Sequence, residues 1–359
     1  MRTTLKPIDL RSDTVTLPTE DMRKAMYQAE VGDDGRLLPD GRHGDPTVAE
    51  LEEHAARLLE KPAALFMASG TMANLTALRT WCPRGAAVAV GRTSHLYRRE
   101  VSAFDDGYFG LRPVELPDPD GLPGADAVRL ALRRHDPAML CLENTHNAAG
   151  GTAWTPRQGA SIHEVTSAAG VPVHLDGARL FNAAVALAVP PGALAAPADS
   201  LMFCLTKGLG APMGAVLLGE AGFIARAREV RRLLGGQMRQ VGVVAAAGLV
   251  ALRDFRERLA LDHERARGLA ERLADLRGAR VDPGRVRTNI VQMLLPDGGP
   301  PLRTVQDELA RQGVLVHSTG ARTVRLVTHR DLSDDDIVHA ADVLHTVLGR
   351  TYQDGSQQQ

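Results

Sequence analysis

The chain has 359 residues, 44% of them hydrophobic and 24% charged, and its formal net charge is −1. This length favours two domains, and the near-neutral charge argues against nucleic acid or an anionic membrane as a partner. No apolar run reaches the ~20 residues that a membrane span needs, and the first residues lack the apolar core of a secretory signal. Three cysteines, Cys82, Cys141 and Cys204, show no CxxC spacing and are expected to be reduced and buried. We therefore expect a soluble cytoplasmic protein.

The first two thirds of the chain predict an irregular arm followed by a large α/β domain. Residues 1–45 contain closely spaced Gly, Pro and Asp and are expected to be irregular. A helix is predicted over 47–59, with Asp45 as its N-cap and Pro46 in its first turn. Five apolar runs then alternate with helical patterns, and their unbroken hydrophobicity is typical of strands buried on both faces of a parallel sheet. These runs are 86–91, 138–144, 171–176, 200–206 and 214–219.

The last third predicts a smaller domain of mixed helices and strands. Residues 240–277 predict one long helix, with or without a break. The elements expected after it are strands over 288–295, 313–318 and 323–329 and helices over 302–312 and 334–348. The fold class is thus α/β, with a mostly parallel sheet in a large domain over 46–265 and a small C-terminal α+β domain over 266–349. The polar residues 350–359 are expected to form a disordered tail.

The segment after the apolar residues 65–67 predicts an anion-binding helix N-terminus. Small and hydroxyl-bearing residues, Ser69, Gly70 and Thr71, open a helix there. Backbone N–H groups at such a terminus bind phosphate, and side-chain hydroxyls add donors. A plain helix cap is the alternative. The chain has no GxGxxG or Walker motif, so a nucleotide is the weaker interpretation of an anion site.

An acidic residue, Asp176, stands at the end of the apolar run 171–176. A buried carboxylate is costly unless it has a partner, and the protonated ring nitrogen of a cofactor would be such a partner. Arg179, three residues further on, is able to bind a carboxylate in the bidentate manner of a guanidinium. The alternative is an ion pair between Asp176 and Arg179 that serves the structure alone.

Lysine is rare in this chain, because only four of its 42 basic residues are Lys: Lys6, Lys24, Lys61 and Lys207. Lys207 follows the run 200–206 and precedes a Gly-rich turn, so its amine is expected at the carboxyl end of the sheet, where α/β proteins bind ligands. A desolvated lysine forms an imine and arginine does not. A lysine that merely reaches for solvent from a strand end is the alternative. An anion site, a carboxylate and an amine together fit pyridoxal 5'-phosphate.

Longer strings in family order over nearly the whole chain carry a resemblance. They are IDLRSDTVT (8–16), VGDD (31–34), GDPT (44–47), SGTMANL (69–75), LENTHN (142–147), HLDGAR (174–179), CLTKGLGAPMG (204–214), GGQMRQ (235–240) and RLVTHRDLS (325–333). With these strings the chain resembles the low-specificity L-threonine aldolases. They belong to the fold type I pyridoxal-phosphate enzymes, so the resemblance implies that fold for the large domain.

The resemblance implies cofactor-binding roles for several residues. It makes Lys207 the lysine that holds pyridoxal phosphate as a Schiff base, and Asp176 the partner of the ring nitrogen. Gly70 and Thr71 match phosphate-binding positions. Arg239 matches an arginine that reaches the phosphate from a neighbouring subunit. A homo-oligomer with shared active sites, a dimer or a tetramer, is therefore expected. The resemblance implies no metal ion.

The resemblance also implies roles at the substrate. Ser12, Arg179 and Arg325 match positions that bind the substrate carboxylate; Ser12 thereby brings the N-terminal arm into the active site, and Arg179 also borders the cofactor. His95 matches a histidine that stacks on the cofactor ring, and His146 matches one near the substrate hydroxyl. Either imidazole titrates near working pH and suits a base, so the sequence leaves this choice open.

The implied reaction is retro-aldol cleavage of the Cα–Cβ bond of a β-hydroxy-α-amino acid, such as L-threonine or L-allo-threonine, to glycine and an aldehyde. A transaldolase or a β-eliminating lyase with the same cofactor is the alternative, because such an enzyme shares every residue named. A non-catalytic protein on the same scaffold is disfavoured, since both Lys207 and Asp176 are present.

Three features depart from the family pattern. Residues 101–110 are bulkier and more acidic than usual, the segment between VGDD and GDPT is longer, and Arg42 and His43 replace a common tyrosine. Because these segments border the active-site entrance in the family, the preference for a substrate side chain stays open.

Overall fold

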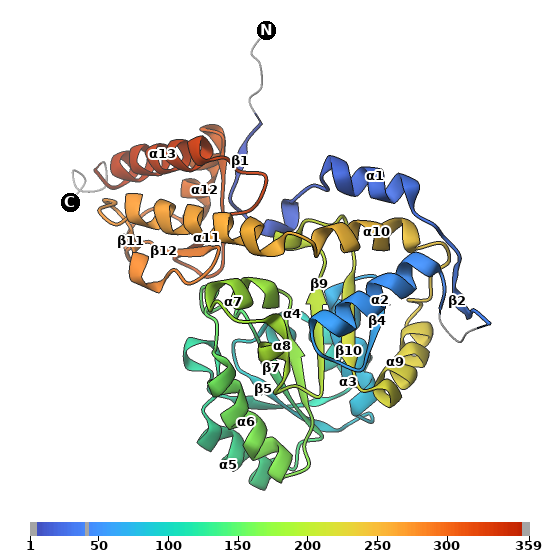
Figure 1. Cartoon of the computed structure of the whole chain (residues 1–359). Helices are drawn as coiled ribbons and strands as arrows, with labels where there is room; N and C mark the ends of the chain where they lie inside the picture. The colour runs from blue at the N-terminus through green and yellow to red at the C-terminus, as the bar shows by residue number, and fades with distance from the viewer. Residues whose placement is uncertain (1–5, 40–42, 354–359) are drawn as a thin grey trace. The chain divides into compact units, whose positions relative to one another are not determined.

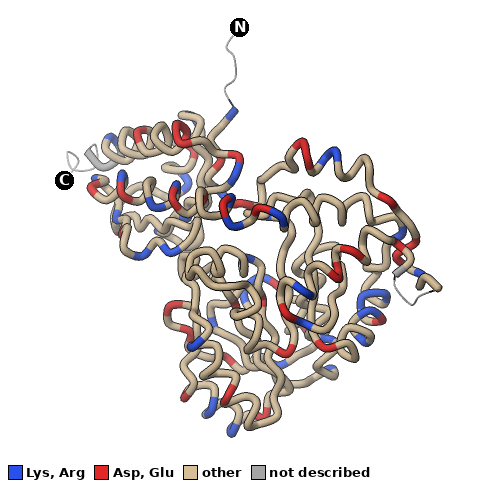
Figure 2. Tube along the Cα trace, viewed as in Figure 1, with Lys and Arg blue, Asp and Glu red and all other residues tan. Residues whose placement is uncertain are grey.

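The computed structural model describes residues 6–39 and 43–353, so Arg42 lies outside the described residues. They form two compact units (Figure 1): a large unit, Leu17–Phe255, and a small unit made of the described parts of Met1–Thr16 and Arg256–Gln359. The first described residues therefore group with the C-terminal part of the chain. Basic and acidic residues are interspersed along both units (Figure 2), consistent with the net charge of −1.

The large unit is built on a mostly parallel sheet, as the sequence predicted. Over the described residues it has seven strands in the order β4-β10-β9-β8-β7-β5-β6, in which only β10 is antiparallel to its neighbours. The strands are β4 (Ala63–Met67), β5 (Ala87–Gly91), β6 (Arg112–Leu116), β7 (Met139–Glu143), β8 (Val173–Asp176), β9 (Ser200–Cys204) and β10 (Ala215–Gly219). Each of the five predicted apolar runs forms one of these strands. All residues of β5, β7, β8, β9 and β10 are buried, because helices lie on both sides of the sheet (Figure 1).

Helices precede and follow the strands. They are α1 (Glu20–Gln28), α2 (Pro46–Leu58), α3 (Gly70–Trp81), α4 (His95–Arg99), α5 (Ala125–His135), α6 (Pro156–Ala168), α7 (Leu180–Ala186), α8 (Pro191–Ala195), α9 (Ala221–Leu233) and α10 (Gly242–Ala251). Several of them, such as α3 and α9, pack on the sheet, and α1 packs on α10. The predicted start of α2 is confirmed, because the Asp45 side chain accepts a hydrogen bond of 3.1 Å from the Val48 N–H and Pro46 opens the helix. A short antiparallel pair, β2 (Asp33–Leu37) and β3 (His43–Gly44), precedes α2.

The expectation of an irregular arm over residues 1–45 is wrong for α1. Thr19 caps this helix by accepting a hydrogen bond of 3.2 Å from the Met22 N–H, which satisfies one of its free donors. Met22, Ala25 and Met26 stand at helical spacing and are buried or half-buried, so α1 has a short apolar stripe. The prediction missed this helix because it judged the whole segment 1–45 from the Gly, Pro and Asp residues concentrated after residue 31.

The small unit contains an antiparallel sheet in the order β11-β12-β15-β14, covered by long helices. Its strands are β11 (Arg280–Val281), β12 (Ile290–Leu294), β14 (His317–Ser318) and β15 (Thr323–Val327), and its helices are α11 (Phe255–Arg272), α12 (Leu302–Arg311) and α13 (Asp334–Gln353). In addition, β1 (Ile8–Asp9) pairs in parallel with β13 (Val314–Leu315), which ties the first described residues to this unit.

Two details of this region differ from expectation or refine it. The predicted long helix is broken, since α10 ends at Ala251 and α11 begins at Phe255. The last helix extends to Gln353, past residue 350 at which the disordered tail was expected to begin. Adding a residue to a formed helix requires no new nucleation, so polar residues continue the packed helix. Within the described part of the chain, no helix combines the length and the apolar character that crossing a bilayer takes.

Candidate active site

The predicted anion site lies at the N-terminus of α3, where the chain leaves β4. Ser69 caps the helix, and its Oγ accepts a hydrogen bond of 3.2 Å from the Met72 N–H. Gly70 and Thr71 occupy the first turn, whose N–H groups have no carbonyl four residues earlier to bind. Both Ser69 and Thr71 are exposed, so the start of the helix is open to a ligand. These are the properties of an anion site.

Gly70 lies so close to β9 that no larger residue fits without movement. A Cβ at this position would stand 2.7 Å from Met202 Cε and 2.8 Å from Cys204 Sγ. Both distances are shorter than a carbon contact tolerates. The glycine therefore lets the first turn of α3 rest directly on the last residues of β9.

Lys207 stands just beyond β9, in the 3-10 turn η4 (Lys207–Leu209). Its backbone is left-handed, with φ of 62°, a conformation that costs a residue with a side chain about 1 kcal/mol or more. The side-chain amine donates to Cys204 Sγ over 2.9 Å. Because the same sulfur adjoins Gly70, the lysine amine and the helix N-terminus meet around Cys204.

Asp176 ends β8 and is only 3% exposed. Its Oδ1 accepts a hydrogen bond of 3.1 Å from the Ala178 N–H, and its Oδ2 accepts one of 3.0 Å from Asn74 Nδ2 on α3. Asp176 pairs in register with Met202 of β9, which brings it to the strand that leads to Lys207. Arg179, which starts α7, is 7% exposed and its Nη1 lies 3.5 Å from Asn147 Oδ1.

Two further buried carboxylates, Glu100 and Glu143, adjoin this group and were not predicted. Glu143 ends β7 beside Asp176 and accepts hydrogen bonds from the N–H groups of His95, at 2.6 Å, and Asn147, at 2.8 Å. Burial raises the pKa of both Glu100 and Glu143. The sequence feature that identified Asp176, a carboxylate at the end of an unbroken apolar strand, is also present at Glu143.

His95 opens α4 and faces the same carboxylates. Its Nδ1 lies 3.4 Å from Glu100 Oε1, and the side chain is 40% exposed. The hydrogen bond with Glu100 raises the pKa of His95, and the charges of Asp176 and Glu143 add to this effect. Its other ring nitrogen, Nε2, has no hydrogen-bond partner among the described residues. Single ligand atoms of His95, Glu100 and Asp176 all lie within 4.8 Å of one another.

His146 is enclosed, with 1% of its surface exposed. Its Nδ1 accepts a hydrogen bond of 3.2 Å from the Ala149 N–H, so a neutral ring carries its hydrogen on Nε2. That nitrogen faces Asp118 Oδ2 at 3.5 Å and Glu143 Oε2 at 3.7 Å. Gly121 packs against the ring so closely that a Cβ there would be 2.3 Å from His146 Cβ. Nδ1 is thus hydrogen-bonded, whereas Nε2 is buried beside two carboxylates without a hydrogen bond to a described residue.

The side chain of Arg239 contacts Asp33 of β2 and not the residues of this cluster. The guanidinium pairs with Asp33 of β2, at 3.0 Å and 3.2 Å to the two carboxylate oxygens, and 72% of its side chain is exposed. This ion pair is the main cause of the lowered pKa of Asp33. Arg239 is therefore presented at the surface of the subunit.

Ser12 and Arg325 belong to the small unit, and the structure brings their segments together there. Ser12 caps the 3-10 turn η1 (Asp13–Val15), and its Oγ accepts a hydrogen bond of 3.3 Å from the Thr14 N–H. Arg325, in β15, is 9% exposed and donates from Nη2 to the Arg11 carbonyl over 3.2 Å. A buried guanidinium that contacts the residue next to Ser12 suits a carboxylate ligand.

The residues of the large unit fit pyridoxal phosphate. The open first turn of α3 suits the phosphate. Gly70 has no Cβ, which lets this turn lie close to β9. Asp176 is a buried carboxylate suited to a protonated ring nitrogen, and Lys207 supplies an amine beside Cys204. Asn74 and Cys204 link these three features by direct contact.

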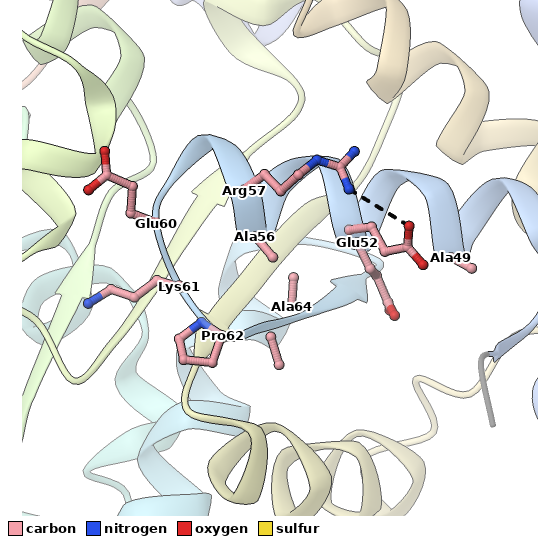
Figure 3. Close-up of a pocket in the computed structure, with 10 residues that line it drawn as sticks. Ala49, Glu52, Ala56, Arg57, Glu60, Lys61, Pro62 and Ala64 are labelled. Carbon is pink, nitrogen blue, oxygen red and sulfur yellow. Dashed lines mark ion pairs between the residues drawn. The ribbon is translucent and has the colours of Figure 1, made fainter. Parts of the chain in front are cut away.

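A cavity of about 480 Å³ lies elsewhere, at the start of β4 rather than at its carboxyl end (Figure 3). Charged side chains of both signs line it: Glu52, Glu53, Arg57, Glu60 and Lys61. Arg57 pairs with Glu53, Glu52 pairs with Arg228, and Lys61 donates to the Ala198 carbonyl over 2.6 Å. This cavity is therefore separate from the predicted site.

A model of the β-eliminating lyase family matches residues 9–295, and this is the class of protein that the fold and the site define. Low-specificity L-threonine aldolase 1 of Arabidopsis thaliana is 39% identical over 345 residues, which cover 93% of this chain and 94% of that protein. The low specificity L-threonine aldolase of Escherichia coli K12 is 37% identical, over 96% of this chain and 100% of that protein. The chain therefore belongs to the low-specificity L-threonine aldolase family, as its sequence strings predicted.

The fold is confirmed by solved structures. The Leishmania major threonine aldolase superposes with a TM-score of 0.78 at 21% identity, and the match covers 95% of this chain and 100% of that chain. A putative L-allo-threonine aldolase from Listeria monocytogenes gives a TM-score of 0.79 at 21% identity, over 95% of this chain and 96% of that chain. The large-domain fold implied by the resemblance is thus correct.

Proposed function

We propose that this protein uses pyridoxal phosphate to cleave the Cα–Cβ bond of β-hydroxy-α-amino acids, such as L-threonine and L-allo-threonine, to glycine and an aldehyde. The observation that carries the proposal is the meeting of the Lys207 amine with the first turn of α3 around Cys204, next to the buried Asp176. Family membership supports the aldolase, because the relatives compared above are named threonine aldolases. These relatives favour an aldolase over a transaldolase or a β-eliminating lyase.

Each cofactor contact follows from the chemistry of the site. Pyridoxal phosphate, when bound, takes up the electrons that the broken Cα–Cβ bond leaves on Cα. Asp176 would hold a positive charge on the ring nitrogen through its buried carboxylate. Ser69, Gly70 and Thr71 would bind the phosphate through N–H and hydroxyl groups, and Lys207 would supply the amine.

His95 is the better candidate for the base. Its Nδ1 faces Glu100, so its Nε2 is left to take the proton of a substrate hydroxyl. His146 has both ring nitrogens directed at protein groups and is almost fully buried. We infer that His146 holds the loop after β7 in place beside Glu143.

As the family resemblance implies, Ser12, Arg179 and Arg325 would bind the substrate carboxylate. Arginine suits this task because its planar guanidinium matches a carboxylate in bidentate geometry. Holding the carboxylate fixes the orientation of the bond to be broken. The exposed Arg239 would reach the phosphate of a neighbouring subunit, so we propose a homo-oligomer, a dimer or a tetramer, in the cytoplasm.

Turnover of L-threonine without any added aldehyde tests this function. The purified protein should release acetaldehyde and glycine in equal amounts, because an aldolase needs no acceptor. Lys207→Ala should lower the rate to below about a thousandth, whereas Lys24→Ala, at an exposed lysine of α1, should leave it unchanged. Glycine formation only in the presence of an acceptor aldehyde, or full activity of Lys207→Ala, would contradict the proposal.

A further inference from the structure

A chain of hydrogen bonds links Asn74 and Trp81 of α3 through two strands of the sheet. The Trp81 indole Nε1 donates to Ser200 Oγ over 2.9 Å, and Ser200 Oγ lies 3.0 Å from His174 Nδ1. His174 Nε2 lies 3.1 Å from Asn74 Oδ1. Ser200, His174 and Asn74 are at most 1% exposed, so water does not compete for these bonds.

The chain has a fixed direction, which the carboxylates at its far end set. Asn74 Nδ2 faces carboxylate oxygens, which only accept, so Asn74 Oδ1 is the atom that faces His174 Nε2, and this nitrogen carries a hydrogen. Burial lowers the pKa of His174 to about 4, so the ring is neutral at physiological pH and its Nδ1 accepts from the Ser200 hydroxyl. Ser200 Oγ in turn accepts from the Trp81 N–H. His174 thus donates to Asn74 Oδ1 and supports the orientation of the amide, and both hydrogens of Asn74 Nδ2 point away from His174.

Two carboxylates receive these hydrogens. Asn74 Nδ2 donates to Asp176 Oδ2 over 3.0 Å and to Glu100 Oε1 over 3.0 Å. Both carboxylates are buried, at 3% and 4% exposure, and the charge of Asp176 contributes to the raised pKa of Glu100. Two such groups repel each other when both are ionised. A donor that binds both at once holds them apart in defined positions.

We propose that Asn74 and His174 are positioning residues that orient the Asp176 carboxylate toward the ring nitrogen of the cofactor. His174 fixes the Asn74 amide, and the amide fixes Asp176 and keeps it distinct from Glu100. This inference rests on the proposed function, since it takes Asp176 as the partner of the ring nitrogen. Neither Asn74 nor His174 needs to touch substrate or cofactor.

The expected consequence is specific to the ring nitrogen. Without the Asn74 donor, Asp176 keeps only the hydrogen bond from the Ala178 N–H, so its Oδ2 is less well fixed and is able to share a proton with Glu100. It then binds a protonated ring nitrogen less well. A cofactor analogue with C–H in place of the ring nitrogen makes no such bond. Loss of Asn74 should therefore weaken the binding of pyridoxal phosphate more than the binding of this analogue.

The test compares dissociation constants of both cofactors after the bound cofactor is removed from the purified full chain and replaced. The readout is the ratio of the analogue's constant to that of pyridoxal phosphate. Asn74→Leu and His174→Leu should each lower this ratio about tenfold relative to the wild type. His174→Gln should largely restore it, because its amide donates to Asn74 and accepts from Ser200.

A matched control is Thr166→Val in α6. Thr166 is also fully buried and hydrogen-bonded, to the carbonyls of Ile162 and His163, and it has no contact with the chain of bonds. The Thr166→Val variant should leave the ratio of the two dissociation constants unchanged. If Asn74→Leu does not fold, the pair His174→Leu and His174→Gln decides the question by itself.

The possible failures are distinguishable. A wild-type protein that binds both cofactors equally would show that Asp176 does not serve the ring nitrogen, which overturns the proposed site and this inference with it. In the other case, the wild type prefers pyridoxal phosphate, but the Leu variants weaken the binding of both cofactors by the same factor. This result would overturn the inference and leave the proposed function intact. In that case Asn74 and His174 would be structural.

Discussion

The amine of Lys207 donates to Cys204 Sγ over 2.9 Å, and the same sulfur lies 2.8 Å from where a Cβ on Gly70 would stand. One side chain at the end of β9 therefore contacts both the amine and the helix N-terminus of the predicted cofactor site. The spacing between phosphate site and lysine is set by this contact. A change of volume at either position should alter cofactor binding.

Gly70→Ala should weaken the binding of pyridoxal phosphate about tenfold, because the added methyl group overlaps Cys204 Sγ and Met202 Cε and pushes α3 away from β9. The double variant Gly70→Ala with Cys204→Ala removes the sulfur and should recover part of the affinity. The measurement is titration of the cofactor-free protein with pyridoxal phosphate.

Gly222→Ala in α9 is the control for this pair, because the nearest atom to its Cβ would be Arg226 Nη1 at 3.9 Å. Its affinity for the cofactor should match the wild type. Equal affinity of Gly70→Ala and the wild type, or no gain from the added Cys204→Ala, would show that the close packing around Cys204 does not set the site.

Glu100→Gln should move the acidic limb of the pH profile of kcat/KM for L-threonine to lower pH. A base must be neutral to accept a proton, so activity falls as the pH drops through the pKa of His95. The hydrogen bond with Glu100 raises that pKa, and a neutral Gln no longer does so.

Glu229→Gln, at an exposed carboxylate on α9, should leave the same limb in place. His95→Asn should remove the limb or most of the activity. A profile that Glu100→Gln leaves unchanged would mean that another group, or a water molecule, is the base.

The strands and Asp176 were predictable because burial has a clear sequence signature. Strands covered on both faces consist of unbroken apolar residues, so β5 and β7 to β10 were visible in the sequence. The edge strand β6 was not, because four of its five residues, including Arg112 and Glu115, are not buried. Asp176 was predictable by the cost of ending such a strand with a charge.

Asn74 was missed for a different physical reason. A polar residue on a helix is ordinarily placed on the solvent face, and its sequence neighbours do not say otherwise. On α3, however, Ala73, Asn74, Thr76 and Ala77 are all buried, so two faces of the helix are covered. The partners of Asn74 come from β8 and from the end of α4, more than 20 residues away, and only the folded chain brings them together.

Arg239→Gln should lower the affinity for pyridoxal phosphate without changing the thermal unfolding midpoint. Its ion pair with Asp33 is exposed, and exposed pairs add little stability. If Arg239 binds the phosphate of a neighbouring subunit, loss of its guanidinium weakens cofactor binding and leaves the stability of the fold unchanged.

Asp33→Asn provides the matched control, because it breaks the same ion pair and keeps the arginine. It should bind the cofactor as well as the wild type does, and light scattering should report the same oligomer for all three proteins. If Asp33→Asn and Arg239→Gln lower the affinity for the cofactor equally, the ion pair itself supports cofactor binding, and the proposed role of Arg239 across subunits is wrong.

Asp262 in the small unit should make the protein less stable as the pH rises from about 4 to about 7. Burial raises the pKa of this carboxyl to about 7 from its ordinary value of 3.8, although Arg258 pairs with it. The folded chain therefore keeps a proton on Asp262 that the unfolded chain has lost, and folding becomes less favourable as that proton is removed. Asp262→Asn has no such proton, so the fall of its unfolding midpoint between about pH 5 and pH 7 should be smaller than in the wild type.

Asp297→Asn, at an exposed carboxylate of the same unit, should follow the wild type. A decline with the same slope in Asp262→Asn and the wild type would show that Asp262 is ionised in the folded protein and that its pairing with Arg258 outweighs burial.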